Sequence, residues 1–326
     1  MWPSLGCRCD LPWRNKGMAS GCEVDCVTVF GGSGFLGSRI VKQLARKGFE
    51  TRVACRHPDN VISQFHSDQH ANILPVYADV RDETSVALAM AGSDAVINAV
   101  GLYVQTGSDR FDAVHELGAV NVAHQASTLE VKRLVHISGI GADLYSASDY
   151  IRARAKGELL VQDVFPAATI LRPSVLFGSK DAFVNTLSRI ARSSPVLPLF
   201  GRGSTMLQPV YVGDVAEAAV NALKATGAPG NVYELGGPQI YSYQALITLV
   251  LTHAKQRRLL FPVPFAIWEI AAKLMSILPR PPLTKAQITL MKQDNIVSGT
   301  ALTLRDLGVD PRSLEDILPR YAFSRP

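Results

Sequence analysis

The sequence predicts an α/β protein with a doubly wound parallel sheet and a smaller C-terminal α/β lobe. From residue 25 to about residue 174, apolar runs of strand length alternate with amphipathic runs of helix length, which is typical of βαβ units. A glycine-rich turn joins the first of these runs to the second. After Pro173, prolines and glycines follow one another closely, which indicates short elements joined by loops.

The elements of the first part follow from this alternation. Strands are predicted at residues 26–30, 51–55, 73–77, 95–100, 133–138 and 169–172, and helices at 35–47, 83–91, 113–129 and 149–164. Right-handed crossover connections then place helices on both faces of the sheet. In the loop-rich second part, helices are expected at 213–224 and 243–253.

The glycine-rich turn predicts a Rossmann-type domain that binds NAD(P). Gly31 lets the strand turn sharply, Gly34 lets the backbone approach a pyrophosphate, and Gly37 lets the helix and strand pack closely. The pyrophosphate then lies at a helix N-terminus, where backbone N–H groups bind anions. The turn residues expected to bind the cofactor are Gly31, Ser33, Gly34, Phe35, Leu36 and Gly37.

These patterns divide the chain into three parts. Residues 23–178 are expected to form the NAD(P)-binding domain, and residues 179–326 the smaller lobe, whose elements are partly interleaved with the first. Residues 1–22 lack the apolar core of a secretory signal and are expected to be a disordered tail, with Met18 as a plausible start. A short mitochondrial presequence is the alternative.

Residues at the ends of the second, third and fourth predicted strands are candidates for the rest of the cofactor site. About twenty residues beyond the glycine turn, dinucleotide-binding folds often place an acidic residue on the ribose hydroxyl, but this chain has Arg56. A cation there favours a 2′-phosphate, and hence NADP(H) over NAD(H). An exposed arginine without a ligand is the alternative. Asp79 and Val80 are expected at the adenine, and Asn98 and Val100 along the cofactor channel.

Ser138 ends the fifth predicted strand and Tyr150 begins the next helix, so a hydroxyl and a phenol could bracket one substrate carbonyl. Such chemistry needs a cation one turn beyond the tyrosine, which lowers the pKa of the phenol, and that position holds Arg154 instead of lysine. Lys156 cannot replace it, because six residues along a helix place it on a different face. Arg154 can bond a ribose, but its bulk argues against efficient catalysis.

The net charge of +5 is unevenly distributed. Between residues 255 and 292 there are seven basic side chains and one acidic side chain, Glu269; the basic ones are Lys255, Arg257, Arg258, Lys273, Arg280, Lys285 and Lys292. This basic segment suits anionic lipid or an acidic protein partner, and a solvated surface is the alternative. Nucleic acid is not an expected partner, because neither an aromatic-interleaved basic face nor a known nucleic-acid-binding motif accompanies these charges.

An apolar run at residues 259–278 is as long as a membrane span. It contains Pro262, Pro264, Glu269 and Lys273, so a transmembrane helix is not predicted. From Phe265 onward the polar residues form one narrow stripe of a predicted helix. Such a helix belongs either in the core or against a membrane or partner surface, and lipid contact through residues 257–285 is the second of these interpretations.

Neither disulfides nor a metal site are expected. The five cysteines are odd in number, and four of them lie in or beside the N-terminal tail, which indicates a reducing compartment. Cys7 and Cys9 have no second ligand pair at a suitable spacing. His66 and His70 lie in a polar stretch, with Ser63 and Gln64, that is expected to be a solvated loop.

Five motifs carry a resemblance to a known family: VFGGSGFLGSRIV at 29–41, ADVRD at 78–82, HISGIGAD at 136–143, YIRARAKGE at 150–158 and LRPSVLFG at 171–178. In these the chain resembles the extended and atypical short-chain dehydrogenase/reductases. Segments 111–123, 193–218, 233–238, 257–265 and 283–298 are similar to one branch of that family, the NAD(P)H-binding accessory subunits of respiratory complex I.

The resemblance implies a tightly held, mainly structural NADPH and no turnover. It implies a subunit docked where the peripheral and membrane arms of complex I meet, on the cytoplasmic face of a bacterial inner membrane or the matrix face of a mitochondrial one. Carried over by position, Tyr150 and Arg154 would hold the nicotinamide ribose, and Pro173 and Val175 the nicotinamide. Asn121 matches a helix asparagine that many extended members place near the active site.

Three hypotheses for function therefore remain after the sequence analysis. The first is a non-catalytic, NADPH-bearing accessory subunit of complex I. The second is a free-standing NAD(P)-dependent reductase or epimerase that acts on a small or quinone-related substrate, which the Ser138 and Tyr150 pair supports. The third is a regulator that reports NADPH by binding alone.

Overall fold

The computed structural model describes residues 24–65, 72–179, 181–278 and 283–320. The tail expected at residues 1–22, and His66 and His70, lie outside these ranges. Among the described residues, seven strands form one parallel sheet in the order β11-β6-β5-β4-β1-β2-β3. The strands are β1 (Cys26–Phe30), β2 (Glu50–Cys55), β3 (Ile73–Tyr77), β4 (Ala95–Asn98), β5 (Arg133–Ile137), β6 (Thr169–Pro173) and β11 (Val232–Leu235). The expected doubly wound α/β fold is confirmed.

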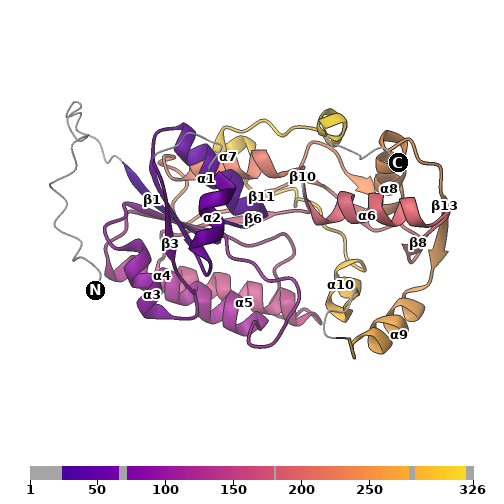
Figure 1. Cartoon of the computed structure of the whole chain (residues 1–326), viewed down its shortest axis with the longest axis horizontal. Coiled ribbons are helices and arrows are strands. Elements are labelled where there is room, and N and C mark those ends of the chain that lie inside the picture. The colour runs from indigo at the N-terminus through magenta and orange to yellow at the C-terminus, as the bar shows by residue number, and fades with distance from the viewer. Residues whose placement is uncertain (1–23, 66–71, 180, 279–282, 321–326) are drawn as a thin grey trace.

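Helices cover both faces of this sheet (Figure 1). One face carries α1 (Phe35–Arg46), α2 (Pro58–Phe65) and α7 (Val212–Ala222), and the other carries α3 (Glu83–Met90), α4 (Gly118–Thr128) and α5 (Asp149–Val164). A π-helical segment, η2 (Asp112–Leu117), leads directly into α4. Crossovers in both directions from β1 therefore open a crevice at the carboxyl ends of the central strands.

The helices on the two faces of the sheet pack against alternate residues of the same strands. In β2, Val53 belongs to the apolar core beneath α1 and α7, whereas Ala54 belongs to the core beneath α3 and α4. Successive side chains of a strand point to opposite faces, so a strand buried on both faces is apolar throughout. This explains why the central strands appear in the sequence as continuous apolar runs.

The structure differs from the sequence prediction at α2. Ser63 and Gln64 were expected in a solvated loop, but they lie in this helix. Pro58 suits the first turn of a helix, and Val61 and Phe65, four residues apart, are both buried in the core. These two buried side chains therefore hold the helix on the core.

After residue 178 the chain returns to the large sheet. Strand β11 pairs with β6, and α7 packs on α1. The remaining described elements form the smaller lobe and its connections to the sheet: β7 (Leu176–Phe177), α6 (Ala182–Ser193), β8 (Val196–Phe200), β9 (Met206–Leu207), β10 (Val210–Tyr211), β12 (Tyr241–Ser242), α8 (Tyr243–His253), β13 (Leu259–Val263), α9 (Phe265–Met275), α10 (Lys285–Leu290), η3 (Arg305–Leu307), α11 (Leu314–Ile317) and η4 (Leu318–Arg320).

Helix α9 lies at the far end of the smaller lobe, beside β13 and β8 (Figure 1). The indole of Trp268 donates a hydrogen bond to the Leu199 carbonyl, and its ring lies 4.6 Å from that of Phe200. Most of the helix is nevertheless uncovered, with Ile270 62% and Leu274 69% exposed. The interpretation of this segment as a core helix is therefore wrong.

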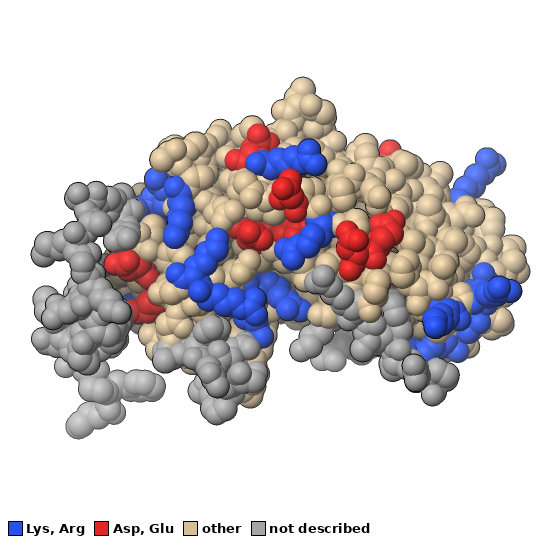
Figure 2. All heavy atoms as spheres, turned by 90° about the horizontal axis from the view of Figure 1, so that it is seen from above, with Lys and Arg blue, Asp and Glu red and all other residues tan. Residues whose placement is uncertain are grey.

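Basic side chains gather at the end of the molecule that carries β13. Figure 2 shows Lys and Arg side chains gathered at the end of the molecule that carries β13, with no acidic side chain among them on the face shown. Just before β13 in the sequence, Lys255 and Arg257 are exposed, and Lys273 is exposed on α9. No helix among the described residues is long and apolar enough to cross a bilayer.

Candidate functional site

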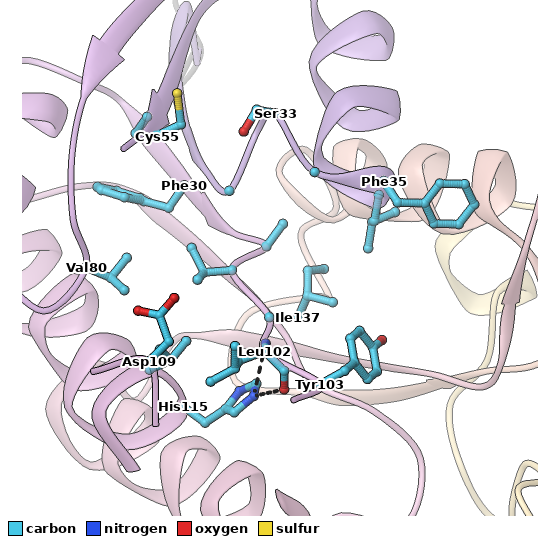
Figure 3. A pocket seen from close by; sticks show the side chains of 18 of the residues that line it. Phe30, Ser33, Phe35, Cys55, Val80, Leu102, Tyr103, Asp109, His115 and Ile137 are labelled. Carbon is cyan, nitrogen blue, oxygen red and sulfur yellow. Dashed lines mark hydrogen bonds between the residues drawn. The ribbon is translucent and has the colours of Figure 1, made fainter. Parts of the chain in front are cut away.

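A cleft of about 370 Å³ lies along the carboxyl-terminal edge of the large sheet. In Figure 3, Ser33 and Phe35 of the glycine turn lie across this cleft from Tyr103 and His115. Parallel α/β sheets bind ligands here because the strand ends diverge at the crevice between crossovers. The residues proposed from sequence that line it are Gly31, Ser33, Gly34, Phe35, Leu36, Arg56, Asp79, Val80, Val100, Ser138, Tyr150, Arg154 and Pro173.

The glycine turn is shaped so that the backbone itself forms one wall of the cleft. Gly31 has φ of +72°, and a Cβ there would lie 2.8 Å from the Ala99 carbonyl oxygen. A Cβ on Gly37 would lie only 2.1 Å from the Gly31 carbonyl oxygen. Gly34 is the N-cap residue just before α1 and supplies no side chain to cap the first turn. The free N–H groups and the helix dipole together suit a pyrophosphate.

Two arginines lie at the end of the cleft where the sequence predicts the adenosine to bind. Arg56 follows β2 and donates to both oxygens of Asp109, at 3.0 and 2.9 Å. Arg81 donates to the same carboxylate at 3.0 Å and to Asp79, with Nη2 2.5 Å from Oδ2. These hydrogen bonds from Arg81 hold the pKa of Asp79 below its usual value. The sequence analysis identified Arg56 and Asp79 but missed Arg81 and Asp109.

The other end of the cleft is aromatic. Tyr150 is 4% exposed, and its ring lies 5.7 Å from Tyr103, 5.4 Å from Phe111 and 5.5 Å from His115. Burial raises the pKa of the Tyr150 phenol well above its usual range, and the nearby Arg154 guanidinium offsets only part of that rise. The phenol is therefore held in its neutral form at physiological pH.

Arg154 occupies the place expected for a catalytic lysine. Its Nη1 donates to the Tyr150 phenol oxygen at 2.8 Å, and its guanidinium lies 5.2 Å from the centre of the same ring. Gly139 leaves room for this guanidinium, which a Cβ at that position would displace. Lys156 is on the outside of α5 and pairs with Glu116 at 2.6 Å, as its spacing from Tyr150 predicts.

Two buried histidines lie near Arg154. Burial, and secondarily the charge of Arg154, lower the pKa of His115 to about 4 and that of His136 to about 4. His115 Nε2 lies 2.9 Å from the Leu102 carbonyl oxygen, and the Asn98 amide lies 3.3 Å from His136 Nδ1. Both imidazoles are therefore neutral at pH 7 and serve as hydrogen-bonding groups for the walls of the cleft.

Ser138 lies at the edge of the cleft, but its hydroxyl is engaged behind it. The hydroxyl donates to the carboxylate of Glu158, which is 3% exposed. Arg172 forms an ion pair with the same carboxylate, and its Nη2 lies 2.6 Å from Glu158 Oε2. The pairing with Glu158, twenty residues away in sequence, was not foreseen. Because this pairing uses the Ser138 hydroxyl, the hydroxyl does not bracket a substrate carbonyl with Tyr150 as the sequence analysis expected.

Three of the residues proposed from sequence do not line the cleft. Gly37 packs beneath the glycine turn, which is the role its position predicts. The Asn98 amide is buried and used by His136 and the backbone of Val100, so the expectation that Asn98 lines the channel is wrong. Val175 lies outside the lining and accepts a backbone hydrogen bond from Val210. Asn121, in α4, donates to the Val80 carbonyl and thereby supports the adenine side.

Some contributors to the cleft have no signal in the sequence. Tyr103 and Asp109 come from the segment after β4, where no periodic pattern or motif marks them, whereas His115 lies in the helix expected at 113–129 and was missed as a site residue. Arg81 could have been found, because it lies in the ADVRD motif directly after Val80. Among the described ranges, no group of three or more His, Cys, Asp or Glu side chains is placed to hold a metal ion.

The sequence and the fold are similar to those of known proteins. The model of the NAD dependent epimerase/dehydratase family matches residues 27–236. NADH dehydrogenase (ubiquinone) 1 alpha subcomplex subunit 9, mitochondrial, of Arabidopsis thaliana is 33% identical over 94% of this chain and 79% of its own length. The mouse protein of that name is 31% identical over 96% and 84%.

A solved structure shows the same fold at lower identity. Triphenylmethane reductase of Citrobacter sp., in complex with NADP(H), is superimposed with a TM-score of 0.71 and is 18% identical. The superposition covers 90% of this chain and 99% of the reductase. At this identity the similarity concerns the fold and not the reaction.

Proposed function

This chain belongs to the NAD dependent epimerase/dehydratase family, and we propose that it is an accessory subunit of NADH:ubiquinone oxidoreductase that holds NADPH as a structural nucleotide. The observation that carries the proposal is the identity of 33% and 31%, over nearly the whole chain, with two proteins named as subunits of NADH dehydrogenase. The glycine turn and the cleft beside it supply the means of holding the nucleotide.

The geometry around Tyr150 supports a structural role for the nucleotide. When bound in a reductase, NADPH supplies a hydride, and the protein must supply a proton beside it. Here the phenol is buried with a raised pKa, and the hydroxyl of Ser138 is used by Glu158. Arg154 donates to the phenol but takes the place of the smaller lysine. These residues suit binding of the nicotinamide ribose better than proton transfer.

Arg56 supports the choice of NADP(H) over NAD(H). It stands at the end of β2, where an acidic side chain would otherwise accept a hydrogen bond from the ribose hydroxyl. A guanidinium there matches the oxygens of a 2′-phosphate and has no acceptor for a hydroxyl proton. Asp79 and Val80 are proposed to lie at the adenine, and Pro173 at the nicotinamide.

The proposed partners are the complex I subunits where the peripheral and membrane arms meet. The chain would then lie on the inner face of a respiratory membrane, which is the cytoplasmic face in a bacterium or the matrix face in a mitochondrion. The uncovered apolar side of α9 supports such a site, because isolated soluble proteins rarely expose several large apolar side chains on one helix.

Native pull-down tests the proposed function directly. With affinity-tagged chain expressed in its own organism, mass spectrometry is expected to find complex I subunits, and gel filtration is expected to leave NADPH bound. A free-standing reductase would instead exchange its nucleotide during gel filtration and purify alone. That result would overturn the proposal.

The α9 face is proposed to lie on a membrane surface that carries anionic lipid. Ile267, Ile270 and Leu274 are all more than half exposed on α9, and Ile277 just beyond it is 87% exposed. Interfacial helices combine such an apolar face with flanking cations, which are attracted to anionic headgroups. Here Lys273 lies on the helix, and Lys292 of the following segment pairs with Glu269 of the same helix at 2.5 Å.

Vesicle flotation measures this contact. The double variant Ile270→Glu/Leu274→Glu is expected to bind vesicles of phosphatidylcholine with one third cardiolipin at least about tenfold more weakly than the wild type, because it places two charges in the interface. Leu88→Glu is the matched control, since Leu88 is 74% exposed on α3, away from this end of the molecule. Equal binding by the double variant and the wild type would contradict a lipid contact through α9.

A further inference from the structure

A single carboxylate lies between the two arginines at the adenosine end of the cleft. Asp109 accepts two hydrogen bonds from Arg56, at 2.9 and 3.0 Å, and one from Arg81, at 3.0 Å. Figure 3 shows this carboxylate beside Val80, pointing into the cleft. All three ionic side chains line the cleft. The arginines therefore converge on one point, and an anionic group already occupies it.

The three residues come from separate parts of the fold. Arg56 follows β2, Arg81 follows β3, and Asp109 belongs to the segment between β4 and η2. Two backbone hydrogen bonds between Thr106 and Asp109, of 3.0 and 2.9 Å, close a turn that presents the Asp109 side chain. The two arginines follow neighbouring strands of the sheet, β2 and β3, whereas the aspartate lies on a loop. The loop is therefore the part of this cluster that can move most easily when a ligand binds.

The net charge of this cluster of side chains determines how strongly it can bind an anionic group. With Asp79, which Arg81 also holds, the cluster contains two guanidinium and two carboxylate groups and has no net charge. A 2′-phosphate carries nearly two negative charges and matches guanidinium groups in the same forked geometry as a carboxylate. It would meet repulsion from Asp109 unless that carboxylate gave up its place.

We propose that Arg56 and Arg81 together bind the 2′-phosphate of NADP(H), and that Asp109 holds these arginines in position until the phosphate displaces it. This inference rests on the proposed function, in which this cleft holds NADPH. Asp109 is then a specificity-determining residue. Its negative charge opposes binding of the 2′-phosphate, which must displace the carboxylate from both arginines. NADH, which has no phosphate there, leaves the cluster intact.

Equilibrium binding of four probes separates the 2′-phosphate from the rest of the cofactor: NADPH, NADH, 2′,5′-ADP and 5′-AMP, at one fixed ionic strength. Asp109→Asn is expected to tighten NADPH and 2′,5′-ADP by about threefold or more, and to change NADH and 5′-AMP by less than about twofold. Asp112→Asn is the matched control, because Asp112 pairs with Arg110 nearby and does not line the cleft.

Arg81→Gln tests the second arginine. It is expected to weaken NADPH and 2′,5′-ADP at least about tenfold and NADH by less than about twofold, with Arg81→Lys between the two. Thermal unfolding of each variant without nucleotide shows whether the loss of the Asp79 pair has disturbed the fold, and the ratio of NADPH to NADH affinity is unaffected by such a disturbance.

Some outcomes would overturn the inference alone. If wild-type protein binds NADPH but Asp109→Asn weakens it, Asp109 supports the site instead of competing for it. If Asp109→Asn weakens NADH, the carboxylate binds the ribose hydroxyl. If Arg81→Gln weakens both nucleotides equally, Arg81 has no part in the phosphate site. A wild-type protein that binds neither nucleotide would overturn the proposed function itself, and this inference with it.

Discussion

Replacing Gly37 by alanine is expected to lower the affinity for NADPH by at least about a hundredfold, which corresponds to roughly 2.7 kcal/mol. The new Cβ would lie 2.1 Å from the Gly31 carbonyl oxygen and 2.8 Å from the Gly32 Cα. Both are backbone atoms of the turn that is proposed to bind the pyrophosphate, so the clash can be relieved only if the turn moves. Overpacking of this kind also destabilises a fold, typically by about 1–3 kcal/mol.

Isothermal titration calorimetry with NADPH measures the first effect, and thermal unfolding without nucleotide measures the second. Gly227→Ala is the matched control, because a Cβ there meets no atom within 4 Å and the residue is remote from the cleft lining. It is expected to change NADPH affinity by less than about twofold. Gly37→Ala protein that bound NADPH as tightly as the wild type would show that the nucleotide does not lie on this turn.

Replacing Glu158 by alanine is expected to reduce the free energy of unfolding by about 3 kcal/mol, or roughly 4–5 °C in Tm for a chain of 326 residues. The carboxylate is buried, accepts from Ser138 and lies 2.6 Å from Arg172 Nη2. Its loss leaves a partly buried guanidinium and a buried hydroxyl without their main partner. Glu158→Gln keeps an acceptor for both and is expected to cost less.

An exposed ion pair provides the comparison. Glu269 lies 2.5 Å from Lys292 on the surface, and Glu269→Ala is expected to destabilise the fold much less than Glu158→Ala, because solvent screens an exposed pair. Chemical denaturation of the three variants beside the wild type measures the differences. If Glu158→Ala were no more destabilising than Glu269→Ala, the buried pair would not be a structural support, and the Ser138 hydroxyl would be open to another role.

The part of the site that could be predicted is the part encoded by short spacings. The glycine turn, Arg56 after β2, and the Tyr150–Arg154 pair one helical turn apart each depend on neighbours within a few residues. The same holds for the six strands from β1 to β6, whose apolar runs are local. Helix α2 was missed because only Val61 and Phe65 mark its buried side.

The pairings across the fold could not be predicted in this way. Asp109 reaches Arg56 from 53 positions away, and Glu158 reaches Ser138 from 20. Which loop meets which strand end depends on the order β4-β1-β2-β3 in the sheet, and no local pattern encodes that order. Asn98 was placed wrongly for the same reason, since its amide turns to His136 on the neighbouring strand.

Short-range patterns in the chain were enough to predict a doubly wound sheet, a glycine turn suited to a pyrophosphate, and a cation where a ribose hydroxyl would otherwise be bound. The folded structure was needed to find that the Ser138 hydroxyl is held by Glu158, that two arginines share Asp109, and that α9 is uncovered. Periodicity tells which side of a helix is apolar, because it follows from the helix geometry alone. What covers that side depends on the packing of distant segments, which periodicity does not contain.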